Sequence, residues 1–72
     1  MNYSSRSARE IELLEEIERR GILVFGLLEA SKILKVERPT ARKVLSRLCS
    51  KEAVKRIERG KYAIARFYSE MD

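Results

Sequence analysis

Three helix-like segments followed by a glycine-centred hairpin constrain the fold of this chain most. Residues 7–10 form a capping box, and apolar residues then recur at helical spacing until Gly21, a residue type that favours a helix end. A second, shorter helix is expected over residues 27–34. A third is expected to carry Pro39 in its first turn, where a missing N–H costs nothing, and to end near Ser50.

Strand-like runs occupy the remaining positions. Residues 22–25 are a β-branched and aromatic run, which predicts a short buried strand. Residues 54–58 and 61–65 predict two more strands joined at Arg59 and Gly60, because glycine can supply the positive φ of a tight hairpin turn. The expected architecture is α+β, with three helices and a three-stranded antiparallel sheet. The order helix, strand, helix, helix, strand, strand is that of a winged helix-turn-helix domain.

The length of the chain leaves room for one small domain with a thin core, since it has 72 residues. We expect this domain over residues 7–65, between a flexible tail of residues 1–6 and a C-terminal tail of residues 66–72. A membrane span and a signal peptide are not expected, because the longest apolar run is too short and the first residues are polar. The single cysteine excludes an intramolecular disulfide, and a cytoplasmic location is expected.

Positive charge is concentrated in the second half of the chain. Residues 1–34 have a net charge of −1, whereas residues 35–72 have a net charge of +6. A basic surface of this kind favours a polyanionic partner such as nucleic acid or an acidic membrane. The alternative is a charge-rich solvated surface of the type seen in thermophiles.

The third helical segment combines an apolar stripe with an opposite face of hydrogen-bond donors and no acid. Such a helix is suited to the major groove of DNA, where arginine can bind guanine at two positions and short hydroxyls can reach phosphates. The candidate DNA-binding residues on this segment are Arg38, Thr40, Arg42, Lys43, Ser46, Arg47 and Lys51. The alternative for single arginines is an ion pair with Glu37 or Glu52.

The hairpin turn supplies a second candidate contact. Arg59 and Lys61 flank Gly60, and Lys55 and Arg56 lie on the preceding strand. A basic turn can follow the DNA backbone into the adjacent minor groove, although such charges also serve to keep a hairpin soluble. We expect Tyr62 and Ile64 to belong to the core.

The third helical segment and the hairpin resemble those of a known family. Residues 36–48 look like the recognition-helix region of winged helix-turn-helix transcriptional regulators, and residues 59–62 are similar to their wing. The resemblance spans about residues 7–65 and is closest to small archaeal, plasmid or viral regulators and to the N-terminal DNA-binding domains of AbiEi-type antitoxins. It implies that the third helix enters the major groove of double-stranded DNA.

Four positions depart from the family pattern, and the smallest change is Ser31, which replaces the usual Ala. Lys35 stands where the turn between the two helices often has glycine, and Glu52 stands where a glycine often precedes the wing. Glu37 replaces the usual Ser, Thr or Asp cap, so weaker capping of the third helix is expected. None of these changes removes the basic face.

The expected function is therefore double-stranded DNA binding, as a sequence-specific transcriptional regulator. An enzyme is disfavoured because the chain has no histidine, no metal-ligand cluster and no base for Cys49, so no cofactor is expected. The alternative is a protein-interaction adaptor within a larger nucleic-acid-processing assembly. RNA is disfavoured because its major groove is too narrow for a helix, and a membrane role because the apolar stripe is expected to be buried. A homodimer is possible, and no small-molecule effector is evident.

Overall fold

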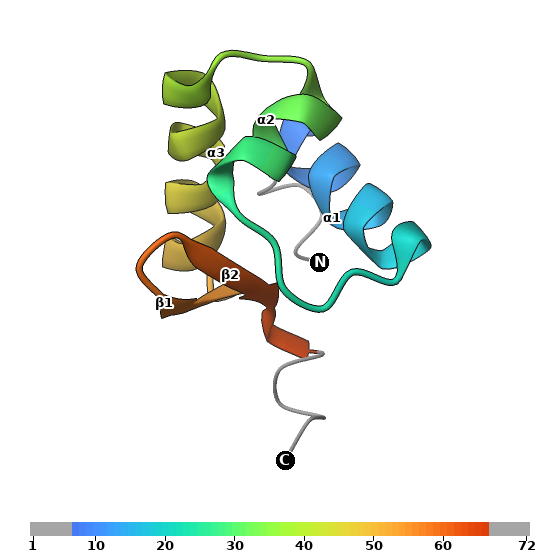
Figure 1. Ribbon diagram of the computed structural model, residues 1–72, viewed down its shortest axis with the longest axis vertical. Helices are drawn as coiled ribbons and strands as arrows, with labels where there is room; N and C mark the ends of the chain where they lie inside the picture. The colour runs from blue at the N-terminus through green and yellow to red at the C-terminus, as the bar shows by residue number, and fades with distance from the viewer. Residues whose placement is uncertain (1–6, 67–72) are drawn as a thin grey trace.

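The computed structural model describes residues 7–66, which form three helices and one hairpin (Figure 1). The elements are α1 (Ala8–Arg20), α2 (Leu27–Leu34), α3 (Arg38–Ser50), β1 (Val54–Glu58) and β2 (Lys61–Ile64). The predicted helices and the predicted hairpin are confirmed, with β2 one residue shorter than expected. The tails predicted for residues 1–6 and 67–72 lie outside the described residues.

The predicted three-stranded sheet is wrong, because the described residues form a two-stranded antiparallel sheet of β1 and β2. Of the expected strand at residues 22–25, only Phe25 pairs, through two backbone hydrogen bonds of 2.9 and 2.8 Å with Tyr62. The Ile22 N–H is instead bonded to the Ile17 carbonyl at the end of α1, which keeps the segment away from β2. Leu23 and Val24 are consequently exposed, at 51% and 44%.

Local signals at the helix ends act as the sequence predicts. The Ser7 hydroxyl accepts a hydrogen bond from the Glu10 N–H at 3.3 Å, and Gly21 ends α1 in the left-handed region with φ 68°. Lys35 ends α2 in the same region, with φ 58°, although it carries a side chain. The Ser31 hydroxyl donates to the Val36 carbonyl at 2.5 Å and so tightens the connection from α2 to α3.

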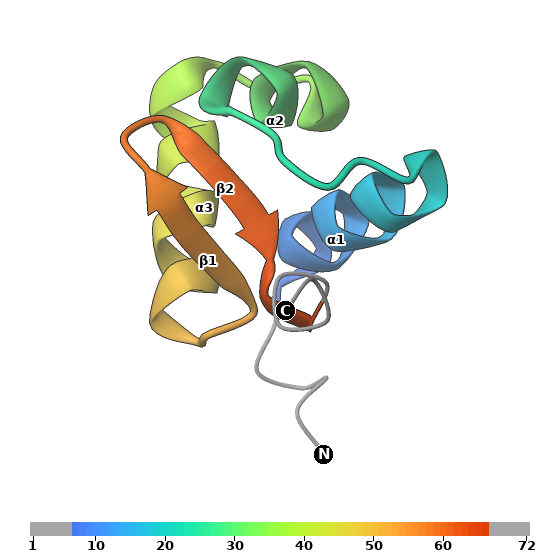
Figure 2. The ribbon, with the colours of Figure 1, turned by 60° about the horizontal axis from the view of Figure 1, so that its bottom comes forward.

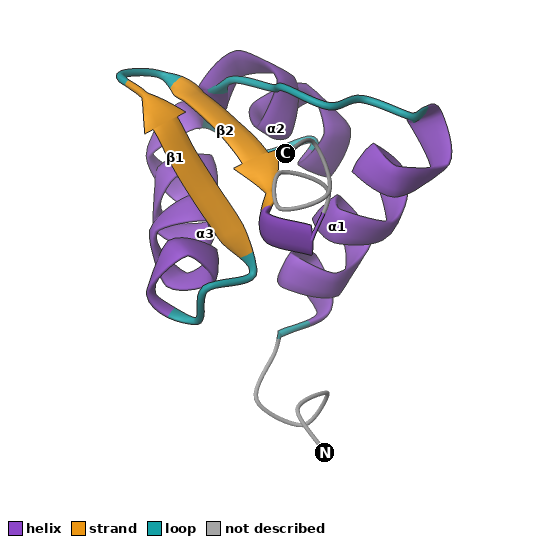
Figure 3. Ribbon diagram, turned by 90° about the horizontal axis from the view of Figure 1, so that it is seen from below, coloured by secondary structure: helices purple, strands orange, loops and turns teal. Residues whose placement is uncertain are grey.

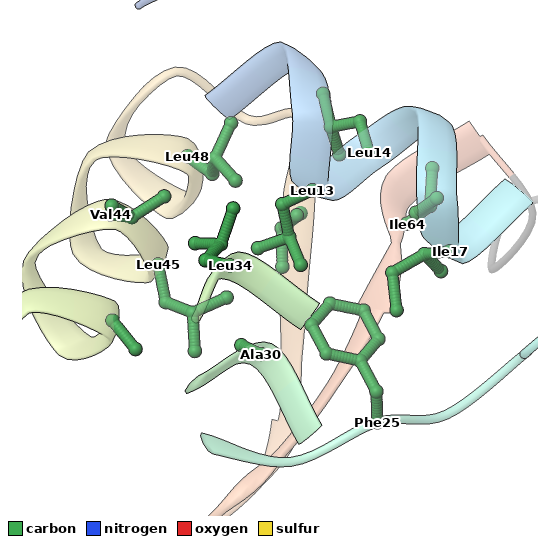
Figure 4. Close-up of a cluster of buried hydrophobic side chains, with 12 residues drawn as sticks. Leu13, Leu14, Ile17, Phe25, Ala30, Leu34, Val44, Leu45, Leu48 and Ile64 are labelled. Carbon is green, nitrogen blue, oxygen red and sulfur yellow. The ribbon is translucent and has the colours of Figure 1, made fainter. Parts of the chain in front are cut away.

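The core is formed where the three helices and the hairpin meet (Figure 4). Leu13, Ile17, Phe25, Leu45 and Leu48 are its largest fully buried apolar side chains. Burial of a side chain of this size contributes roughly 1.5–3 kcal/mol, so the inward face of α3 is held firmly. The hairpin lies alongside α3 with its turn near the start of α2 (Figure 2), and this arrangement leaves the outer face of α3 uncovered by the described elements.

Candidate nucleic-acid interface

The two faces of α3 divide as the helical pattern predicts. The four apolar residues of the predicted stripe are all buried, and they are Ala41, Val44, Leu45 and Leu48. The candidate contact residues on the other side are exposed, apart from the half-buried Thr40, and they are Arg38, Arg42, Lys43, Ser46 and Arg47. Pro39 lies in the first turn, and Glu37 occupies the N-cap without a side-chain cap hydrogen bond to any described residue.

The cations on this face have no acidic partner within residues 7–66. Arg38, Arg42, Lys43 and Arg47 take part in none of the ion pairs of the described chain. The alternative pairing with Glu37 or Glu52 is absent from the same residues. Four positive charges on one helix face are therefore available for an anionic partner.

Lys51 behaves differently from the other candidates, because its ammonium lies 2.7 Å from the Glu10 Oε1 atom. This ion pair joins the end of α3 to the first turn of α1, and the Glu10 side chain is only 2% exposed. Burial raises the pKa of Glu10, but the hydrogen bond and charge of Lys51, helped by hydrogen bonds from Ser7, outweigh burial and leave this pKa below its ordinary value. Lys51 thus has a role inside the fold that its place on the donor face did not predict.

The helical pattern of α1 contained a signal for this pair. Glu10 lies three and four residues before Leu13 and Leu14, so it shares their inward face. A carboxylate at such a position requires a partner, because an unpaired buried charge is very costly. The identity of that partner could not be read from the sequence, because Lys51 is 41 residues away.

The hairpin turn has the predicted glycine geometry. Gly60 has φ 80°, and both of its flanking residues, Arg59 and Lys61, are exposed. The Lys61 ammonium lies 3.3 Å from a carboxylate oxygen of Glu58, and both side chains are about 60% exposed. Such an exposed pair is worth about 0–1 kcal/mol at most, so Lys61 can readily exchange this partner for another anion.

Tyr62 and Ile64 pack inward, as predicted. Ile64 is buried, and Tyr62 is half-buried against the core with its ring stacked on Phe25 at a centroid distance of 6.1 Å. Together with the two backbone hydrogen bonds between Phe25 and Tyr62, this stacking fixes the hairpin to the connection between α1 and α2.

A groove of about 880 Å³ separates α3 from the hairpin, whose strands lie alongside this helix (Figure 3). Its lining combines arginines from both sides with apolar side chains. The lining residues are Leu27, Arg42, Ser46, Cys49, Glu52, Val54, Lys55, Arg56, Arg59, Gly60 and Tyr62. The expected hairpin contacts are Arg59 and Lys61, at the turn. The groove instead brings Arg56 and Arg59 together with Arg42, while Lys61 lies outside the lining.

A strand-register signal could have singled out Arg56. Side chains alternate along a strand, so Arg56 shares a face with the buried Val54 and lies opposite Tyr62. Arg56 also lies near Cys49 of α3, which is half-buried in the groove. Burial raises the pKa of the Cys49 thiol, and the positive charge of Arg56 opposes part of that increase.

Comparison of the chain with protein-family models, with curated proteins and with solved structures gave no match. The helices of the described region are all too short or too polar to cross a membrane. Residues 7–66 also contain no cluster of three or more His, Cys, Asp or Glu side chains that could hold a metal ion.

Proposed function

We propose that this chain is a winged helix-turn-helix domain that binds double-stranded DNA and acts as a sequence-specific transcriptional regulator. The order of the three helices and the hairpin supports this fold assignment. The bridge between Phe25 and Tyr62 of β2 also supports it, because such a domain has a short first strand beside the hairpin. The hairpin then corresponds to the wing.

The observation that carries the proposal is the exposed face of α3, with four cations that have no acidic partner in the described chain. A helix of 13 residues is about 20 Å long and, with side chains, about 10–12 Å wide, which fits the major groove of B-DNA. Arg42 and Arg47 have the length and the planar donor fork to bind guanine. Arg38 and Thr40, at the start of the helix, are suited to phosphates.

Selection of bound duplexes from a random pool, at physiological salt, tests the proposal. We expect enrichment of a short consensus, and a palindromic consensus would indicate a homodimer. With about four to six phosphate contacts, the logarithm of the association constant should fall against the logarithm of salt concentration with a slope near −4 to −5. A lack of enrichment together with a salt-insensitive affinity would refute DNA binding.

Arginine variants locate the contact surface. We expect Arg42→Ala and Arg47→Ala each to cost about 1–3 kcal/mol of binding free energy and to relax the base preference. Arg19→Ala is the matched control, because Arg19 lies on α1, is paired with Glu16 and makes the same change in net charge. If all three variants bind the selected duplex equally, the proposed surface is wrong.

A protein-interaction adaptor is the second candidate function. The exposed apolar side chains of Leu23, Val24 and Leu28, at the connection between α1 and α2 and at the start of α2, favour it. An adaptor of this kind would give no consensus in the duplex selection, and Arg42→Ala would leave its partner binding unchanged.

A further inference from the structure

The groove between α3 and the hairpin has the shape and charge to hold a DNA backbone. We infer that one strand of the duplex lies along this groove, with its phosphates held by Arg42, Arg56 and Arg59. The inference rests on the proposed function and adds to it the route of the strand and a phosphate contact at Arg56.

Three arginines from three different segments line this one hollow. Arg42 comes from α3, Arg56 from β1 and Arg59 from the hairpin turn. Within the described chain none of the three is engaged in an ion pair. The guanidinium fork matches the oxygens of a phosphate, and arginine is only weakly hydrated, so such a cluster suits phosphates that follow one another along a strand.

The hairpin is held against the body of the domain and does not project from it. A Cβ atom built on Gly26 would lie 3.1 Å from the Gly60 carbonyl oxygen, so the turn abuts the start of α2. The bridge and the ring stacking between Phe25 and Tyr62 add to this attachment. A hairpin fixed in this way presents Arg56 and Arg59 into the groove beside α3, whereas Lys61 lies outside it and is paired with Glu58.

Glu52 is an acidic residue in the lining of the groove, and phosphates are disfavoured beside it. It follows α3 and lines both this groove and a second hollow near Glu18 and Arg66. Like charges repel, so a carboxylate in the lining of the groove disfavours phosphates beside it. The strand therefore runs past the Arg42 end of the groove and leaves before Glu52, and Glu52→Gln should strengthen binding to all duplexes.

Salt-dependent affinity of the selected duplex tests the three arginines. Loss of one phosphate contact makes the slope of log association constant against log salt concentration less steep by about 0.9. If the variant and the wild type bind equally at 1 M salt, the variant then binds about fivefold more weakly at 0.15 M salt. We expect this change for Arg56→Ala and for Arg59→Ala, with the same loss on unrelated duplexes. Arg19→Ala and Arg20→Ala, which remove the same charge from α1 outside the groove, should leave the slope within experimental error. Circular dichroism melts should show that all variants are folded.

The outcomes separate this inference from the proposed function. If Arg42→Ala and Arg47→Ala weaken binding but Arg56→Ala and Arg59→Ala match the Arg19→Ala control, DNA binding stands and the groove route is wrong. If the wild-type protein binds no duplex, the proposed function itself fails.

The thiol of Cys49 provides a second readout in the wild-type protein. It is the only cysteine of the chain, and it lines the groove. We expect a saturating amount of the selected duplex to slow alkylation of Cys49 by iodoacetamide at least fivefold, because a strand in the groove covers the sulfur. An alkylation rate that is unchanged by the bound duplex would overturn the inference.

Discussion

Replacing Lys51 with alanine removes the charged partner of a carboxylate that the fold buries. The Lys51 ammonium lies 2.7 Å from Glu10, whose side chain is 2% exposed, and the pair joins the end of α3 to the start of α1. In the variant, Glu10 must either remain charged at a buried position without its charged partner or take up a proton. Both outcomes lower the stability of the folded state at neutral pH.

The exposure of the two side chains sets the size of this effect. Removal of one partner from a fully buried pair costs about 3–5 kcal/mol, whereas an exposed pair is worth about 0–1 kcal/mol. Lys51 retains 31% of its side-chain exposure, so the pair lies between these limits. We therefore expect Lys51→Ala to lower the free energy of unfolding by about 2 kcal/mol, or the melting temperature by about 10 °C for a domain of this size.

The loss should depend on pH in one direction. The pKa of Glu10 in the folded state lies below its ordinary value of 4.5, so the pair stabilises the wild type fully above that value. This contribution disappears as the pH falls through the lower, folded-state pKa. In Lys51→Ala the buried carboxylate gains from protonation, so the stabilities of variant and wild type should converge in acid.

Thermal melts followed by circular dichroism between pH 3 and pH 7 test this prediction. The pH dependence of the stability difference should correspond to the uptake of about one proton. The control is Arg20→Ala, which breaks an exposed pair with Glu16 on the same helix α1 and should change the melting temperature little. The stabilising role of the pair is refuted if Lys51→Ala and Arg20→Ala have the same melting temperature at neutral pH. It is also refuted if the difference in stability between Lys51→Ala and the wild type stays unchanged in acid.

Three further predictions concern backbone strain and the thiol. Lys35→Gly should stabilise the fold by roughly 0.5–1 kcal/mol, because Lys35 has φ 58° and a side chain there costs more than the added freedom of glycine in the unfolded chain; a lower melting temperature would contradict this. Gly60→Ala should destabilise by about 1–2 kcal/mol in urea unfolding through its φ of 80° alone, since a Cβ there would meet no described atom within 4 Å. In the protein without DNA, alkylation of Cys49 should require a higher pH than alkylation of cysteine in solution, because burial raises the pKa of the Cys49 thiol. Arg56→Ala should raise this pKa further, because it removes a positive charge that opposes the increase. An alkylation profile like that of cysteine in solution would refute the effect of burial.

Much of the fold was predictable because its signals are local. The cap at Ser7, the left-handed residues Gly21 and Gly60, and Pro39 in the first turn of α3 each act on a few neighbouring residues. Helical spacing likewise separates the buried stripe of α3 from its exposed donors without any knowledge of what covers the stripe. These features set the bounds of the helices and of the hairpin, and most of the candidate contact residues.

Long-range pairing was not predictable in the same way. The run at residues 22–25 has the composition of a strand, but only Phe25 finds a partner, because Ile22 is bonded to the end of α1. The burial of Glu10 beside Lys51 and the meeting of Arg56 with Arg42 also depend on segments that are distant in the chain.

The sequence by itself determined three helices, a hairpin and a helix face rich in cations, because each depends on spacing and on residue type within a few positions. Only the tertiary structure decided that the sheet has two strands, that Lys51 faces α1, and that the hairpin forms a basic groove with α3. The physical reason is that burial and pairing depend on which surfaces meet after the helices pack, and one side chain can satisfy only the partner that packing brings within reach.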